Sequence, residues 1–583
     1  MAASRASERN AREFYETKQR AVNFYRENRI PEQLEEILNS MFYDSPADVY
    51  GYLAEYFETL AKPPSIHKVT AREVLDAKGQ PTVQADITCI IKGLEKPFSR
   101  ATASSMNHLP DNIPVEKKEV DEKERQQFTN AAVDTVNGPI REALAGLDPT
   151  QQSEVDDAII KLLEKLKEEA DKKEEEERLK RIEEELNQEP KEPAKEEKVV
   201  SPKGKKKAGS ARSGIVLIEE PREPMYPGCS AACAVSQAVA MAGAAVKKVE
   251  LYEHVSHLAG NVNIEEYMMP IPMMSVLSSG KPAPGKQNLI KELLLLPKPG
   301  CPLVESMKKL TSVYQQIGKL LFAKSGVAAN YVNDLGTYTP QYDRQEQLLD
   351  LVQEAVQALE LVPGEDIFMA LNCAAHEIYE PEKNKYEVTA GLMKTPDDMV
   401  EFYADLISRY PAVVALIDPF RKQDCEPWSK LCERLSEKCY IIGEHVFPRV
   451  ERFVREGFGE LASSGVSLRM RQLTTVTDII QASSLIKEEG SITMVASVPG
   501  DTSETFLADL AVGVRATFVK FGAPARGERT SKYNRLLQIS ESLKEQGQIM
   551  VLEEFAFPVK RPPTPPAEEG ADGTSADQTG GAA

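Results

Sequence analysis

The sequence holds few of the residues that build disulfide frameworks, zinc sites or membrane spans. Its 583 residues include eight cysteines, six histidines and one tryptophan. No two cysteines form a CxxC pair, so we interpret them as reduced thiols of a cytoplasmic protein. No apolar run reaches the roughly 18 residues that a membrane-spanning helix needs, and the polar first residues predict no signal peptide. We therefore expect a cytoplasmic protein with no membrane partner.

Basic residues are outnumbered by acidic ones, 71 against 91, which gives a formal net charge of −20. A chain of this sign is a poor ligand for free nucleic acid, so we expect no nucleic-acid partner. Hydrophobic residues make up 41% of the chain, which is enough for a sizeable core. The length predicts several domains rather than one.

Residues 1–62 predict a small all-α module. Ser45-Pro46 is expected to open a second helix, with Asp48 in its first turn. Two short amphipathic helices bury little surface alone, and dimerisation into a four-helix unit would cover their apolar face. That predicted docking face consists of Ile30, Leu34, Leu38, Leu53 and Phe57. The alternative is an ordinary helical hairpin packed on the main domain.

The pattern resembles the dimerization/docking module of protein kinase A regulatory subunits and of several flagellar proteins. About 35 residues carry this resemblance, in the stretch IPEQLEEILNSMFYDSPADVYGYLAEYFETLAKPP. It implies a homodimeric module that binds an amphipathic helix or a flagellar protein.

A region of mixed helices and strands is expected from 63 to 265. Alternating β-branched residues around Lys78-Gly79-Gln80-Pro81 predict a hairpin, and residues 120–170 have a helical pattern. In a charged insertion at about 165–225, the first half is predicted to be a solvated helix and the second half a disordered linker. Its basic end could contact a polyanion such as a microtubule surface, with a solvated linker as the alternative. The Pro/Gly/Ala-rich tail, 558–583, is expected to be disordered.

Buried apolar runs alternate with amphipathic helices between 266 and 557. The runs are ELLLLP, DIFMALNC, AVVALID, CYIIG, SITMVAS and TFVKFG. This alternation predicts a parallel α/β barrel. In such barrels the functional residues lie at the carboxyl ends of the strands.

Four stretches resemble the enolase family. They are AREVLDAKGQPTVQAD (71–86), CAVSQAVAMAGAAVKKVELYEHVSHLAGN (233–261), YPAVVALIDPFRKQDCEPWSK (410–430) and FVKFGAPARGERTSKYNRLL (518–537). The resemblance implies an α/β fold: an enolase-type α/β barrel preceded by an α+β enolase N-terminal domain, here with the small all-α module in front. It implies phosphopyruvate hydratase activity, the reversible dehydration of 2-phosphoglycerate to phosphoenolpyruvate in glycolysis. It also implies magnesium as cofactor and a dimer.

The positions that match the family's metal ligands are largely changed. Asn372 stands where the family has a strand-end aspartate, and Ile417 replaces a ligand glutamate. Glu444 keeps a carboxylate at the third position, and Ser105 is a weak match to a ligand serine of the second magnesium. One carboxylate beside an amide and an alkyl chain predicts weak magnesium binding.

The acid–base positions are also mixed. Arg469 stands at the position of the family's base, where it stays protonated and so cannot take a proton. Glu292 keeps a catalytic and substrate-binding glutamate, and Lys520 keeps the lysine that contacts the substrate carboxylate, whereas Leu335 replaces a second acid. Glu292 and Lys520 could act on substrate, or could remain as a buried structural pair.

Two hypotheses for function remain open at this point. The first is a lyase that converts 2-phosphoglycerate, with low or absent activity because the metal and base positions are degraded. The second is a non-catalytic enolase-fold assembly protein of the sperm flagellum. The chain could form a homodimer, or a mixed oligomer in which another enolase supplies activity.

Overall fold

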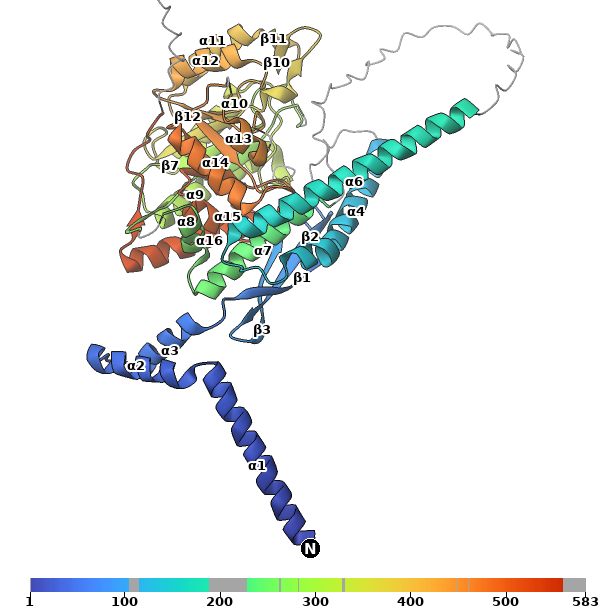
Figure 1. Cartoon of the computed structure of the whole chain (residues 1–583). Helices are drawn as coiled ribbons and strands as arrows, with labels where there is room; N and C mark the ends of the chain where they lie inside the picture. The colour runs from blue at the N-terminus through green and yellow to red at the C-terminus, as the bar shows by residue number, and fades with distance from the viewer. Residues whose placement is uncertain are drawn as a thin grey trace, which may run out of the picture. The chain divides into compact units, whose positions relative to one another are not determined.

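The structure, a computed structural model, describes residues 2–103, 115–187, 228–261, 264–281, 283–327, 331–447, 449–459 and 461–558. The chain divides into two compact units (Figure 1). The first comprises residues 1–64 with 90–94, and the second comprises 65–89 with 95–583. Ser105 and the expected disordered tail from residue 559 lie outside the described residues.

The first unit is helical. It contains α1 (Ala2–Glu27), α2 (Ile30–Asp44) and α3 (Val49–Leu60). Ser45 ends α2 in the left-handed conformation, with a φ of 42°. The expected start of the next helix at Pro46 is wrong by a few residues, because Asp48 is the N-cap of α3 and its carboxylate accepts a hydrogen bond from the Gly51 N–H at 2.9 Å.

The second unit begins with a three-stranded sheet in the order β1-β2-β3. Its strands are β1 (Ser65–Leu75), β2 (Pro81–Ile91) and β3 (Leu94–Thr102). The helices that follow are α4 (Val115–Thr135), η1 (Val136–Ile140), α5 (Arg141–Leu144), α6 (Gln152–Asn187), α7 (Ser230–Lys247) and α8 (Leu251–Leu258). The first part of the charged insertion is thus helical through Asn187, and residues 188–227 lie outside the described residues.

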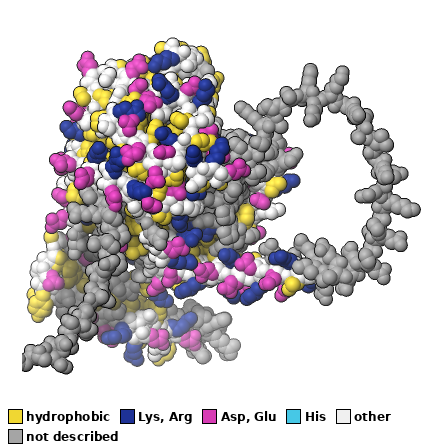
Figure 2. Space-filling model, turned by 90° about the horizontal axis from the view of Figure 1, so that it is seen from above, with side chains coloured by type: hydrophobic (Ala, Val, Ile, Leu, Met, Phe, Trp, Pro, Cys, Tyr) yellow, Lys and Arg dark blue, Asp and Glu magenta, His cyan; other side chains and the backbone are white. Residues whose placement is uncertain are grey.

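The carboxyl-terminal half of helix α6 extends away from the rest of its unit (Figure 1). Lys/Arg and Asp/Glu side chains are interspersed over the face seen in Figure 2, as on a solvated surface. By contrast, α7 is apolar and long enough to cross a membrane, but 78% of it is buried inside the fold. Its small side chains instead let it pack as a core helix against α6 and α8.

A nine-stranded sheet forms the barrel, in the order β5-β16-β15-β14-β13-β12-β8-β7-β6. Its strands are β5 (Ile271–Pro272), β6 (Met274–Ser278), β7 (Glu292–Pro297), β8 (Ile367–Asn372), β12 (Val413–Ile417), β13 (Tyr440–Gly443), β14 (Gly465–Leu468), β15 (Ile492–Ala496) and β16 (Phe518–Lys520). This sheet confirms the predicted α/β barrel.

Helices lie on the outer side of this sheet (Figure 1). They are α9 (Leu303–Ser325), α10 (Glu346–Gln357), α11 (Pro396–Arg409), α12 (Cys425–Leu435), α13 (Val450–Glu456), α14 (Val476–Glu488), α15 (Phe506–Gly513) and α16 (Gly527–Gln546). Short accessory strands are β4 (Tyr267–Met268) with β17 (Ile549–Met550), and β9 (Tyr379–Glu380), β10 (Lys385–Thr389) and β11 (Leu392–Lys394).

The expectation of an all-parallel barrel is wrong at one strand. Strand β7 pairs antiparallel with both β6 and β8. A loop without a crossover helix joins β6 to β7, which permits an antiparallel pair. Two helices, α9 and α10, pack together between β7 and β8, so the chain returns to the end of the sheet that it left. The amino end of β7 therefore lies beside the carboxyl ends of β6 and β8.

The barrel interior is apolar below that end. Its buried cluster is made of Ile271, Met273, Leu294, Leu296, Ala370, Val414, Ala415, Ile417, Tyr440, Ile442, Met494 and Phe518. Such a packed interior leaves chemistry to the strand ends and the loops after them. The N-terminal domain also attaches near that end, since the Asp156 carboxylate accepts hydrogen bonds from the N–H and the hydroxyl of Thr477, at the start of α14.

Candidate active site at the carboxyl ends of the strands

The barrel brings the residues expected at the active site to one end of the sheet. Asn372, Ile417 and Lys520 are the last residues of β8, β12 and β16. Glu444 and Arg469 directly follow β13 and β14. Glu292 is the first residue of β7 and reaches the same end because β7 runs antiparallel. These five strands and β7 therefore supply one common cluster.

Ile417 contributes only hydrocarbon to this cluster. The residue is fully buried and belongs to the apolar interior. Its register partners are Asn372 on β8 and Ile442 on β13. The side chain thus extends the apolar core up to the site, and it offers no ligand atom at the position where the family has a glutamate.

The Glu444 carboxylate is held by two cations. Lys520 Nζ lies 2.6 Å from Oε2, and Arg469 Nη1 lies 3.4 Å from Oε1. Arg469 Nη2 also donates to the backbone oxygen of Glu444 at 3.0 Å. Burial would raise the pKa of the Glu444 carboxyl, but Lys520 and then Arg469 outweigh it and hold that pKa well below its usual range. Glu444 is therefore ionised and paired at neutral pH.

Glu292 and Asn372 form a second polar contact beside this triad. The Asn372 amide donates to Glu292 Oε1 at 3.1 Å, and the Ser275 hydroxyl donates to Oε2 at 3.0 Å. Lys520 Nζ lies 3.9 Å from Glu292 Oε1. The structure thus places Lys520 between two carboxylates, closer to Glu444 than to the partner that the sequence suggested.

The inherited metal position does not fit magnesium. Magnesium requires oxygen ligands, usually with carboxylate charge. Here the one retained carboxylate, Glu444, is already bound by Lys520 and Arg469, and Ile417 supplies no oxygen. Asn372 Oδ1 is buried without a hydrogen-bond partner among the described residues, yet one neutral oxygen does not make a magnesium site.

Hydrogen bonds hold the turn at the lost second acid, Leu335, and the loop that follows β15. Leu335 is half-buried in a turn that Asn333 closes by accepting the Leu335 N–H at 3.0 Å. The loop that follows β15 is held by Arg529, whose guanidinium donates to the Ser497 hydroxyl at 3.0 Å and to the Val498 carbonyl at 2.9 Å. These contacts stabilise the loops and leave no acid at Leu335.

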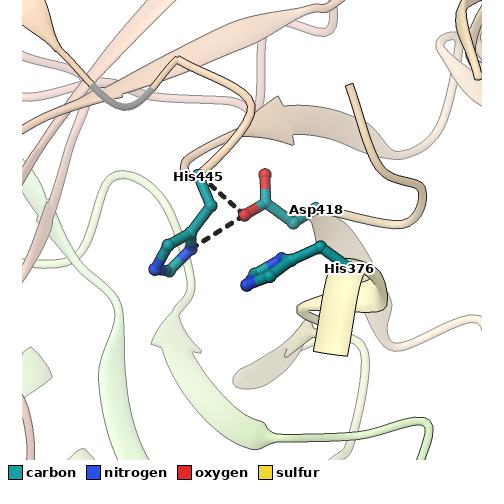
Figure 3. A group of neighbouring side chains, drawn as sticks. All are labelled: His376, Asp418 and His445. Atoms are coloured by element: carbon teal, nitrogen blue, oxygen red, sulfur yellow. Dashed lines mark hydrogen bonds and ion pairs between the residues drawn. The ribbon is translucent and has the colours of Figure 1, made fainter. Parts of the chain in front are cut away.

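A second cluster at the same end was missed from the sequence. Asp418 is fully buried and left-handed, with a φ of 47°, so its carboxylate turns toward the loop after β13. It accepts hydrogen bonds from the backbone N–H groups of Glu444 and His445, both at 2.7 Å, and lies 3.0 Å from His445 Nδ1 (Figure 3). His376 completes the cluster, with its ring 4.7 Å from that of His445.

The available sequence signal was position. Asp418 directly follows a predicted strand, and His376 and His445 stand within a few residues of two others. Desolvation, and then the nearby charge of Arg469, lower the pKa of His445, and the opposing contact with Asp418 does not offset them. The His445 ring is therefore neutral at pH 7.

These features define a class of protein: an enolase-type barrel with an α+β domain in front of it. The family model of the enolase C-terminal TIM barrel domain matches residues 266–555, and that of the enolase N-terminal domain matches residues 66–170. The chain belongs to the enolase family. Family members act on 2-phosphoglycerate and phosphoenolpyruvate as glycolytic lyases, use magnesium and are generally oligomeric.

Several relatives share nearly the whole length of the chain. Enolase 4 of Xenopus laevis is 36% identical over 560 residues, which cover 94% of this chain and 96% of the relative. Enolase 4 of Homo sapiens and Enolase 4 of Mus musculus are each 36% identical, over 572 and 576 residues, and cover 94% of this chain. The alignments cover 91% and 92% of those relatives. The similarity therefore extends beyond the two enolase domains.

Proposed function

We propose that this enolase-family protein has little or no phosphopyruvate hydratase activity of its own and serves as an assembly protein. The observation that carries the proposal is the triad of Lys520, Glu444 and Arg469. Lys520 and Arg469, 2.6 and 3.4 Å from the Glu444 carboxylate, pair with the anion that would otherwise bind a metal ion. The inherited reaction builds negative charge on the substrate carboxylate, and here no described group replaces the missing metal charge.

Proton transfer is impaired for a related reason. A base must lose its own proton before it can take one from substrate, and an arginine does not do so at neutral pH. Lys520 is the family lysine that the site retains, but it forms an ion pair with Glu444. Taking a substrate proton would require that this buried pair first be broken. Activity would therefore fall by orders of magnitude.

The test is phosphoenolpyruvate formation by the full chain, purified free of host enolase, over a range of magnesium concentrations. We expect no rate above the blank, and no difference between the wild type, Lys520→Met and the control Lys309→Met. Lys309 is a matched control because its ion pair with Asp366 lies far from the triad in the fold. A magnesium-dependent rate that is lost in Lys520→Met but kept in Lys309→Met would contradict the proposal.

The assembly part of the proposal is supported by the exposed apolar face of the first unit. Leu34, Leu38 and Phe57 are 41%, 51% and 41% exposed, while Ile30 and Leu53 are half-buried. A pair of short helices with such a face gains stability by pairing with a second copy into a four-helix unit. That unit would then bind an amphipathic helix of a partner, and the barrel would pair with itself or with another enolase.

Cross-linking distinguishes pairing of this unit from pairing of the barrels. Isotopically light and heavy full-length chains are mixed, cross-linked through lysines and analysed by mass spectrometry. We expect light-to-heavy links at Lys62, beside α3, that disappear in Leu38→Asp and persist in the exposed control Glu35→Lys. Links that survive Leu38→Asp would refute the docking face.

The proposed setting of this assembly is the cytoplasm, in the sperm flagellum. The resemblance of residues 30–62 to the docking modules of flagellar proteins supports it. Immunolocalisation in sperm, with an antibody against an epitope that other enolases lack, tests this setting. A signal confined to the cell body would contradict it.

A further inference from the structure

We propose that His376, Asp418 and His445 bind one divalent transition-metal ion of the zinc class at the mouth of the barrel. One ligand atom from each residue lies within 4.8 Å of the others. The three side chains converge in Figure 3. This cluster is separate from the inherited metal position, and the proposal does not depend on whether the barrel retains dehydratase activity.

The fold fixes the three residues on neighbouring strands. Strands β8, β12 and β13 are adjacent in the sheet, and each ligand follows the carboxyl end of one of them. His376 lies in the short helix η3 (Ala375–Glu377), whose first N–H donates to the backbone oxygen of Asp418 at 3.0 Å. The Asp418 N–H in turn donates to the backbone oxygen of Ile442 at 2.9 Å. Backbone hydrogen bonds thus hold the cluster together without an ion.

The donor set suits zinc rather than magnesium. Two imidazoles and one carboxylate are a common ligand set of zinc sites with an open position, whereas magnesium selects oxygen ligands alone. Adjacent ligand atoms of a tetrahedral zinc site are about 3.3 Å apart, given metal–ligand bonds of about 2.0–2.1 Å. His445 Nδ1 and Asp418 Oδ2 are already 3.0 Å apart. The ion would take the place of the proton between these two atoms, and the neutral His445 ring would then carry its proton on Nε2.

Access and charge also favour an ion at this place. The side chains of His376 and His445 are 30% and 35% exposed, so an ion can enter, while the Asp418 carboxylate is fully buried. Two cations near the site are already paired, Arg469 with Glu444 and Lys291 with Glu377. Glu377 Oε1 also lies 3.9 Å from His376 Nε2, which places a second carboxylate beside the site.

The test uses the tag-free full-length chain with cobalt(II) as a spectroscopic probe and zinc(II) as competitor. We expect one equivalent of cobalt to bind, with the visible absorption of a nitrogen- and oxygen-ligated ion, and zinc to displace it. His376→Gln and His445→Gln should each weaken binding at least tenfold. His257→Gln is the matched control, because His257 is an exposed histidine on α8 in the same unit.

Four results would overturn the proposal, three of them in the binding measurements. The first is that the wild type does not bind cobalt. The second is that the two site variants bind it as tightly as the wild type. The third is that His257→Gln loses as much affinity as the site variants. Thiolate absorption bands would also overturn it, because they would assign the ion to the free cysteines. A second readout guards against misfolding: zinc should raise the melting temperature of the wild type and of His257→Gln, and should leave that of correctly folded site variants unchanged.

Discussion

Replacing Glu444 by glutamine removes the anion of the buried triad and leaves its two cations. At an effective dielectric constant of about 20, Coulomb's law gives roughly 6 kcal/mol for Lys520 at 2.6 Å and roughly 5 kcal/mol for Arg469 at 3.4 Å. Desolvation of the three charges offsets most of this attraction. Removing one partner of a buried pair nevertheless costs about 3–5 kcal/mol, because the other charge stays buried and unpaired.

Glu444→Gln should lower the free energy of unfolding by about 3 kcal/mol, the low end of that range. Lys520 keeps a carboxylate within reach, Glu292 Oε1 at 3.9 Å, and Arg469 keeps the backbone oxygen at position 444. The melting temperature should fall by roughly 6–12 °C if the barrel unfolds as a unit of ordinary domain size. Asp405→Asn, which breaks an exposed pair with Arg409, should change the stability by less than about 0.5 kcal/mol.

A double-mutant cycle measured by urea unfolding separates charge from packing. Glu444→Gln/Lys520→Met removes an anion together with its nearest cation, so its destabilisation should be smaller than the sum of the two single losses by at least about 1 kcal/mol. Additive losses, or a Glu444→Gln protein as stable as the wild type, would refute the reasoning.

The pH dependence of this effect has a defined sign. The folded-state pKa of Glu444 lies below its unfolded value, so its contribution is fully present above the unfolded pKa of about 4.3. The contribution is then lost as pH falls toward the folded pKa. The stability difference between wild type and Glu444→Gln should therefore be constant near neutral pH and should shrink in acid.

Two further predictions concern buried side chains. Burial raises the pKa of Asp156 to about 6, so the folded state keeps this proton to higher pH than the unfolded state does. The free energy of unfolding therefore falls as pH rises from about 4 to 6, by up to about 3 kcal/mol. Asp156→Asn should flatten that dependence in urea unfolding, and an unchanged slope would assign it elsewhere. Ile417→Glu should lower the free energy of unfolding by on the order of 3 kcal/mol, because it puts an unpaired carboxyl in the apolar interior. The control Ile417→Leu keeps an apolar side chain and should lower it by less than about 1.5 kcal/mol. A Glu variant as stable as the Leu variant would mean that the position has more access to water or cations than the structure gives it.

The sequence predicted the barrel and the place of the site because strand-end motifs are local. Asn372, Ile417 and Glu444 could be located from the residues around them, and all three lie at the expected end. The direction of β7 could not be predicted, because the apolar run ELLLLP is compatible with either direction. It is set by the helix pair between β7 and β8, a tertiary feature.

The Asp418 cluster shows a different limit of sequence reasoning. Side-chain alternation along a strand predicts that Asp418 points away from the face of Ile417, which makes it a poor substitute for the lost ligand there. The residue lies just past the strand and adopts a positive φ, where strand alternation no longer applies. Its carboxylate consequently meets His445, whose place just after a strand indicates the same end of the barrel but not this contact.

The lost metal ligands and the lost base are physically coupled through Glu444. Without a divalent ion, a buried carboxylate at this position needs other positive charge, and Arg469 and Lys520 provide it. Arg469 does so in a way that a lysine would not, because its fork reaches both the carboxylate and the backbone oxygen of Glu444. Reverting Arg469 to lysine alone should therefore weaken the triad without restoring a base, since the new amine would be drawn into the same ion pair. Release of Arg469 and Lys520 from Glu444 would require carboxylates at positions 372 and 417 as well. Each of those carboxylates would have to be introduced where the barrel is now apolar or neutral.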